Sequence, residues 1–177
     1  MHRAGNWWGE ATIDERNGYL AGYLACALYD ARKVGLNEDR WQVLEKMISQ
    51  KYSTGAEPRS MPVGALALRL SAMPRPREWG GEQESGGAAE IHAEKYGFFD
   101  GEFWRQSSKD VRQGFVEGYV DCCGDESIAG ARFSGTAQEH VSAISAWYGV
   151  SEDGDSMDAN RSETKIPDVL RRVGARR

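Results

Sequence analysis

The chain has 177 residues, a formal net charge of −5, 40% hydrophobic residues and 28% charged residues. This globular balance excludes wholesale disorder, and the acidic charge argues against the basic surface by which proteins hold nucleic acid. Because of this acidic charge, we expect no nucleic-acid partner. No apolar run is long enough to cross a bilayer, so we also expect no membrane insertion. The length suits one domain, or two half-domains that share a core.

The first residues, MHRAGNWWGE, lack the apolar segment of a signal peptide. We therefore expect a cytoplasmic protein if Met1 is the native start, and a periplasmic or secreted protein if a leader was removed. The three cysteines, Cys26, Cys122 and Cys123, are too few for a disulfide scaffold and leave the compartment open.

The sequence repeats itself, because residues 5–26 match residues 101–122 at an offset of 96 without a gap. The identical pairs are Gly5/Gly101, Trp8/Trp104, Asp14/Asp110, Arg16/Arg112, Gly18/Gly114, Gly22/Gly118, Tyr23/Tyr119 and Cys26/Cys122. Average composition predicts only about one or two identities in such a stretch. We therefore predict one repeat at 1–72, a flexible linker at 73–96 and a second repeat at 97–177, with chance similarity as the alternative.

In the first repeat, Thr12 stands at an N-cap position and forms a capping box with Glu15. This pattern predicts a helix from Ile13 to Lys33 that ends at Gly35. A second helix is predicted by an apolar stripe at helical spacing: Trp41, Leu44, Ile48 and Tyr52. A third, short helix is predicted to begin at Pro62, because proline suits the first helical turn.

The second repeat follows the same order. Ser108 stands at the N-cap position and predicts a helix from about Lys109 to Cys123 that meets Gly124. The next apolar stripe is Ala137, Val141, Ile144 and Tyr148, and a last short helix begins at Pro167. No stretch alternates like a strand, so the predicted fold is all-α, with two pseudo-symmetric repeats of about three helices each that share a core.

Glycines stand inside the first helix of each repeat, at Gly18 and Gly22 and at Gly114 and Gly118. Each costs about 1 kcal/mol relative to alanine, so we expect them to allow another backbone to approach. The two glycine faces pack either on each other or on the second helix of their own repeat. In the first case Cys26 and Cys122 reach bridging distance, and we expect a disulfide under oxidising conditions; in the second, both are small buried thiols.

Motifs that carry chemistry are scarce in this chain. His2, His92 and His140 have no metal-ligand spacing, and GxSxG, P-loop and GxGxxG patterns are absent. The acidic loop from Asp153 to Asn160 departs from the calcium-binding EF-hand template. We therefore predict no metal site, no cofactor and no catalytic residue, and we expect a binding protein rather than an enzyme.

Several repeated side chains are candidates for binding. Arg16 and Arg112 either tie down carboxylates and carbonyl groups within the fold or bind an anion at the surface. Trp7, Trp8 and Trp104 either staple a helix start to the core or form an exposed aromatic patch for a partner.

The repeated segment has the pattern Arg-x-Gly-(Tyr/Phe)-(Leu/Val)-x-Gly-Tyr-(Leu/Val)-x-Cys, at residues 16–26 and 112–122. It resembles the Rap1a/Tai-type domain of small bacterial helical proteins. Some members of that family are immunity proteins that neutralise cell-wall-degrading effectors of type VI secretion. Family members usually carry a signal peptide, a single domain copy and a further downstream cysteine, from which this chain departs.

The expected function is therefore the binding of a protein or peptide, as a bacterial inhibitor or immunity factor without catalytic activity. The alternative is a small-ligand binder or enzyme whose pocket lies at the repeat interface. Arg16, Arg112, Tyr23 and Tyr119 would line that pocket. The oligomeric state is left open by the sequence.

Overall fold

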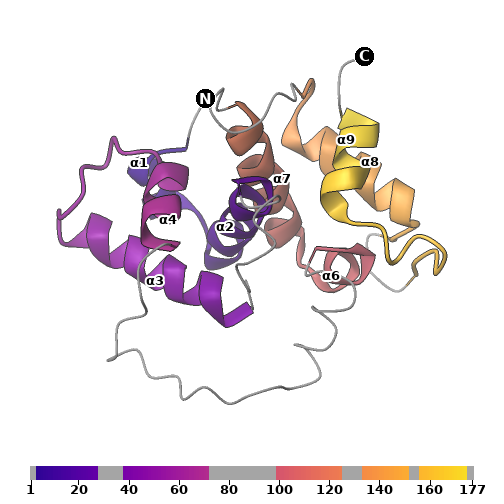
Figure 1. Ribbon diagram of the computed structural model, residues 1–177, viewed down its shortest axis with the longest axis horizontal. Helices are drawn as coiled ribbons and strands as arrows, with labels where there is room; N and C mark the ends of the chain where they lie inside the picture. Colours follow the sequence, from indigo (N-terminus) through magenta and orange to yellow (C-terminus); the bar gives the residue numbers. More distant parts are fainter. Residues whose placement is uncertain (1–2, 28–37, 72–98, 125–132, 152–155, 175–177) are drawn as a thin grey trace.

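The computed structural model describes residues 3–27, 38–71, 99–124, 133–151 and 156–174 (Figure 1). These ranges contain eight helices and no named strand, which confirms the all-α prediction. None of these helices has both the length and the apolar character that crossing a bilayer requires. The predicted linker at 73–96 and the predicted helix extension from residue 28 to Lys33 lie outside the described residues.

The described residues of the first half form four helices: α1 (Gly5–Glu10), α2 (Ile13–Ala27), α3 (Glu38–Ser53) and α4 (Val63–Ser71). The predicted capping box starts α2, because the Glu15 amide donates to Thr12 Oγ1 over 3.1 Å and the Thr12 amide donates to Glu15 Oε2 over 2.7 Å. Pro62 directly precedes α4.

From residue 99 onward, the part of the chain that the structure describes also forms four helices: α6 (Gly101–Gln106), α7 (Lys109–Gly124), α8 (Ala137–Tyr148) and α9 (Ile166–Gly174). Thr136 and Glu139 form a capping box at the start of α8, and Gly149 ends that helix in the left-handed conformation. Pro167 is the second residue of α9.

The prediction of about three helices per repeat was wrong, because the six-residue helices α1 and α6 precede α2 and α7. Trp7, Trp8 and Trp104 therefore lie within short helices rather than just before long ones. Six residues make less than two turns, too few for a periodic apolar pattern to appear in the sequence. The buried Asp100 caps α6, since its carboxylate accepts hydrogen bonds from two backbone amides of that helix.

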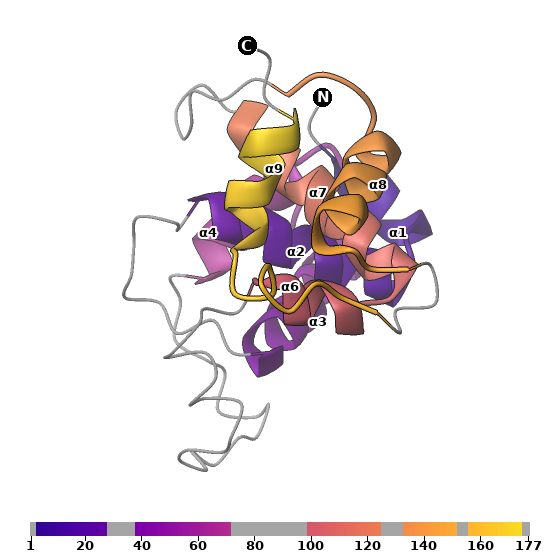
Figure 2. The same ribbon diagram turned by 90° about the vertical axis from the view of Figure 1, so that its right-hand side faces the viewer.

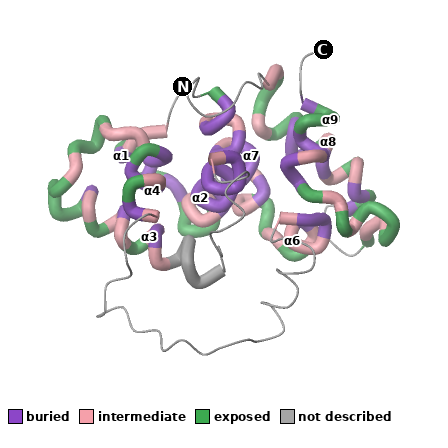
Figure 3. The backbone as a smooth tube through the Cα atoms, viewed as in Figure 1, coloured by how far each residue is buried: buried purple, intermediate pink, exposed green. Residues whose placement is uncertain are grey.

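The centre of the molecule is the pair α2 and α7, which lie side by side (Figure 1). Helices α1, α3 and α4 lie to one side of this pair, and α6, α8 and α9 lie to the other. In the view turned by 90°, α8 and α9 come to the front (Figure 2). Buried residues run along most of α2 and α7, as Figure 3 shows, so these helices form the shared core of both halves.

The glycine faces of α2 and α7 pack on each other, backbone against backbone. A Cβ atom placed at Gly18 or Gly22 would fall closer than 3.0 Å to the carbonyl oxygens of Val111 or Phe115. A Cβ atom at Gly114 or Gly118 would meet the carbonyl oxygens of Glu15 and Tyr19 in the same way. Real Cβ atoms essentially never come this close, so the two backbones approach each other only because these positions lack side chains.

Side chains add polar contacts between the two central helices. The Thr12 hydroxyl donates to Asp110 Oδ2 over 3.2 Å, and the Ser108 hydroxyl donates to Asp14 Oδ2 over 2.6 Å. Farther along the pair, the Tyr19 hydroxyl donates to Asp121 Oδ2 over 3.0 Å. The N-terminal end of each helix is thereby held by a side chain from the other.

Similar contacts occur within the two halves at positions 96 residues apart. Trp8 Nε1 donates to Ser49 Oγ over 2.9 Å, and Trp104 Nε1 donates to Ser145 Oγ over 3.0 Å. The rings of Tyr52 and Tyr148 lie against Gly5 and Gly101, respectively, where a Cβ atom would clash with them. Each of these tyrosine hydroxyls donates to a backbone carbonyl oxygen, of Met61 in one half and of Thr164 in the other.

We predict that Gly22→Ala lowers the free energy of unfolding by about 3 kcal/mol or more, because the new methyl group meets the fixed Phe115 backbone. Urea unfolding followed by circular dichroism measures the change. Gly9→Ala is the matched control, because Gly9 lies in α1 with open space around it, and it should raise stability by about 0.5–1 kcal/mol. Equal effects of the two substitutions would contradict the observed packing.

Candidate functional site

Arg16 is held by its own half of the chain. Its Nη1 atom donates to Glu45 Oε1 on α3 over 3.1 Å. Its guanidinium carbon lies 5.4 Å from the centre of the Trp8 ring, at a distance typical of a cation–π contact. The side chain is therefore a bridge between α1, α2 and α3.

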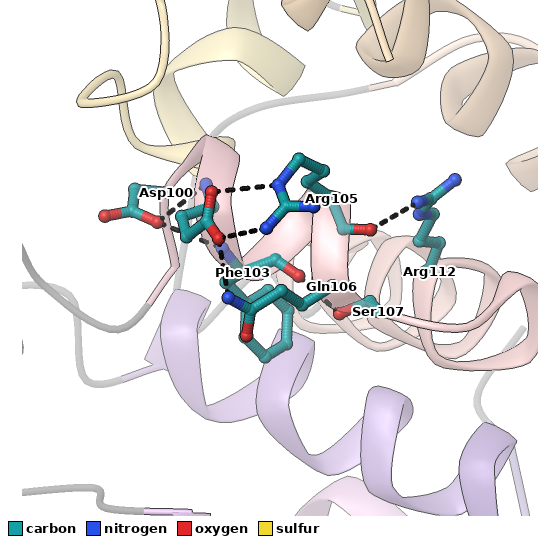
Figure 4. A network of polar contacts seen from close by, with 7 residues as sticks. Asp100, Phe103, Arg105, Gln106, Ser107 and Arg112 are labelled. Carbon is teal, nitrogen blue, oxygen red and sulfur yellow. Dashed lines mark hydrogen bonds and ion pairs between the residues drawn. The ribbon is translucent and has the colours of Figure 1, made fainter. Parts of the chain in front are cut away.

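Arg112 is more deeply buried, with 8% of its surface exposed. Its Nε atom donates to the carbonyl oxygen of Trp104 over 2.8 Å. Its Nη2 atom donates to the carbonyl oxygen of Arg105 over 3.1 Å, as Figure 4 shows. These carbonyls belong to the C-terminal end of α6, where helical carbonyl groups lack partners. Burial lowers the pKa of the guanidinium. Arg112 thus secures α6 to α7, whereas Arg16 acts in the other half.

Tyr23 and Tyr119 are both buried. The Tyr23 ring stacks on the ring of Tyr19 and lies where a side chain at Gly64 of α4 would stand. The Tyr119 ring packs edge-on against Phe133, with 6.0 Å between ring centres. Each ring fills the core of its own half.

The three candidate tryptophans differ in accessibility. Trp8 is 2% exposed and Trp104 is 0% exposed, so neither offers a surface to a partner. Trp7 is partly exposed and lies between Tyr19, at 5.1 Å between ring centres, and the guanidinium of Arg3. Of these three side chains, Trp7 is the one with surface left for recognition.

A disulfide joins Cys26 of α2 to Cys122 of α7, with 6.1 Å between the Cα atoms. The third cysteine, Cys123, is a buried thiol. Its sulfur lies 3.5 Å from the Cys26 sulfur. Burial raises the pKa of the Cys123 thiol to about 11, although Arg171 and a hydrogen bond with Tyr119 act in the opposite direction. The structure therefore brings three sulfur atoms together at one end of the central helix pair.

One surface was missed by the sequence interpretation. It lies where both α2 and α7 begin, at the opposite end of the pair from the cysteines. We name it the α2–α7 end and define it as residues 12–14 and 108–110, between which hydrogen bonds join the two helices. Ile13 lies at this end, and 65% of its surface is exposed. Among the described residues, two large hydrophobic side chains are exposed, and Ile13 has the higher exposed fraction. The repeated pairs Thr12/Ser108 and Asp14/Asp110 were the available signal, but they were interpreted as local helix caps within each repeat.

Metal-binding clusters of three or more His, Cys, Asp or Glu side chains are absent from the described part of the chain. His140 is buried against Phe133, and burial lowers its pKa. His2, His92 and the segment from residue 152 to Asp155 of the acidic loop lie outside the described residues.

Comparisons of the chain with protein-family models, with curated proteins and with solved structures find no match.

Replacing Arg112 tests whether its hydrogen bonds to α6 stabilise the fold. Arg112→Met should lower the free energy of unfolding by about 2–4 kcal/mol, because it leaves two helix-terminal carbonyls without their charged donor. Arg69→Met, which breaks an exposed pair with Glu57, should cost no more than about 1 kcal/mol. Chemical denaturation measures both, and a loss for Arg112→Met no larger than for Arg69→Met would contradict this role.

The disulfide should contribute strongly to stability, because it closes a long loop with a sequence separation of 96. Loop-entropy arguments give about 4–5 kcal/mol for a loop of this size. We predict a loss of that order when urea unfolding is repeated in a phosphine reductant. Cys123→Ser should show the same loss, since Cys123 is not in the bond. Identical unfolding midpoints with and without reductant would contradict the prediction.

Proposed function

We propose that this chain is a non-catalytic protein- or peptide-binding protein built from two tandem, pseudo-symmetric helical repeats. We further propose that it acts as a bacterial inhibitor or immunity factor, as the resemblance to Rap1a/Tai-type domains implies. The proposal has two parts, the duplicated architecture and the recognition of a partner at the surface.

The duplication is supported by contacts that recur at the offset of 96. The Trp–Ser hydrogen bonds from Trp8 and Trp104, the tyrosine rings against Gly5 and Gly101, and the reciprocal caps at the α2–α7 end each occur twice. In these cases, residues that are paired at the offset of 96 thus make equivalent contacts in the two halves. A duplication with a two-fold relation between the halves accounts for both the identities and the contacts. The axis of that relation would run between α2 and α7.

Recognition at the surface is supported by the way in which the repeated side chains are used. Arg16 and Arg112 bind groups within their own halves, Trp8 and Trp104 are buried, and the glycine faces are in backbone contact. This last observation carries the proposal, because close backbone contact leaves no room for a ligand between α2 and α7 along their glycine faces. The residues of the Rap1a/Tai-like pattern thus build the scaffold, and recognition falls to other residues.

The α2–α7 end is the surface that we propose for the partner. Ile13 is exposed there on a helix start that is fixed by hydrogen bonds from the opposite helix, so little conformational entropy is lost when a partner covers it. Asp14 follows Ile13 in the chain, and the Asp110 carboxylate accepts a hydrogen bond from Thr12, the residue before Ile13. These two carboxylates at the same end favour a partner segment with apolar and cationic residues.

The test is an inhibition assay with a cell-wall hydrolase encoded beside this gene. The purified hydrolase digests peptidoglycan while turbidity is followed, and an equimolar amount of this chain should suppress digestion at least tenfold. Ile13→Asp should weaken inhibition tenfold or more, because it places a charge at the centre of the contact. Val173→Asp is the matched control, since Val173 is also exposed but lies on α9.

The absence of any hydrolase gene beside this one would contradict the immunity role. Full digestion in the presence of excess chain would contradict it as well. If inhibition occurs but Ile13→Asp inhibits as well as the unmodified chain, the α2–α7 end is not the contact surface.

A further inference from the structure

The cysteine cluster holds a disulfide and a thiol in contact. The Cys123 sulfur lies 3.5 Å from the Cys26 sulfur, which is already bonded to Cys122. All three side chains are buried: Cys26 is 9% exposed, Cys122 is 0% and Cys123 is 5%. Thiol–disulfide exchange needs a thiolate in reach of a disulfide sulfur. Here the disulfide sulfur nearest the Cys123 thiol belongs to the same molecule, and both sulfurs are shielded from bulk solvent.

We propose that Cys123 is an internal exchange thiol, which moves the disulfide from Cys26–Cys122 to Cys26–Cys123. Cys123 loses its proton, and its sulfur forms a bond with the Cys26 sulfur. The bond between Cys26 and Cys122 breaks, and Cys122 leaves as a thiolate that takes up a proton. One disulfide and one thiol are present before and after the step, so no external oxidant or reductant is needed.

The positions of the three cysteines determine which helices the disulfide joins before and after the exchange. Cys122 and Cys123 are adjacent on α7, while Cys26 is the sole cysteine described on α2. Either bond therefore fastens α2 to α7, so the covalent tether persists whichever of the two α7 sulfurs is left as the thiol. The exchange concerns the scaffold itself, so it stands apart from the proposed partner recognition.

The surroundings of Cys123 determine how fast the exchange proceeds, because they set the fraction of thiolate. Burial raises its pKa to about 11, so the thiol is mostly protonated near neutral pH and the exchange is slow. Two neighbours act against burial, namely the cationic Arg171 on α9 and Tyr119 one turn earlier on α7. Below pH 11 the thiolate fraction rises about tenfold per pH unit, and the exchange rate should rise with it.

The first experiment compares Cys122→Ser with Cys26→Ser after air oxidation. Cys122→Ser should form the Cys26–Cys123 disulfide, show no free thiols when titrated in denaturant, and lose stability on reduction. Cys26→Ser, the matched control, should gain no reductant-sensitive stability, because it has no sulfur on α2. Two free thiols in oxidised, folded Cys122→Ser would overturn the proposal.

The second experiment follows the unmodified chain and does not depend on any variant folding. The oxidised protein is incubated at pH 7, 8, 9 and 10, quenched in acid, denatured and alkylated with N-ethylmaleimide at pH 4. Electron-transfer fragmentation of the peptide that contains both α7 cysteines then shows which of them carries the label. Circular dichroism at each pH confirms that the chain stays folded.

Label should begin on Cys123 and spread to Cys122, with a rate that rises about tenfold per pH unit. Label confined to Cys123 at every pH, in protein that remains folded, would overturn the proposal. A label spread that appears only where circular dichroism shows unfolding would overturn it too, since exchange would then belong to the unfolded chain.

Discussion

The close approach of α2 and α7 is the constraint on which the rest of the structure depends. Two helices normally stand 8–10 Å apart because side chains separate them. Here four glycines remove those side chains, and carbonyl oxygens of each helix lie where Cβ atoms would stand on the other. The helices gain dispersion contacts along their backbones, which offsets the low helix propensity of glycine. The same approach brings Cys26 within bonding distance of Cys122 and puts Cys123 in contact with the bond.

Once the central pair is fixed, the remaining helices are positioned by polar anchors that reach into each half. Indole nitrogens of Trp8 and Trp104 are satisfied by serines of α3 and α8, and the two arginines hold side chains or carbonyl groups of their own half. A buried polar group without a partner destabilises a fold, so these anchors help to fix the positions of α1, α3, α6 and α8. The repeated arginines, Trp8 and Trp104 are therefore occupied by contacts within the fold, whereas Ile13 at the α2–α7 end stays exposed.

The long helices were predictable from the sequence because apolar periodicity and caps extend over several turns, as at Thr12 and along the stripe that ends at Tyr148. Helices α1 and α6 were not predictable, since six residues show no period and their tryptophans look equally like staples of the next helix. The glycine stripe indicated a close contact but did not name its partner, because Gly18 and Gly22 would look the same against α3 as against α7. The contact of Cys123 with Cys26 and the cross-helix caps depend on the relative rotation of two helices, which one-dimensional spacing does not contain.

The distance along the chain between the two central helices has a consequence during protein synthesis. Residues in contact across the pair are separated by about 96 positions, as in the case of Cys26 and Cys122. At about 5–20 residues per second, α2 leaves the ribosome some 5–20 s before its counterpart. For that interval the N-terminal half has its own aromatic core residues but no cover for the glycine face of α2. A nascent chain of this protein therefore offers an open helix face for several seconds, which a second nascent chain or a chaperone can reach before α7 closes it.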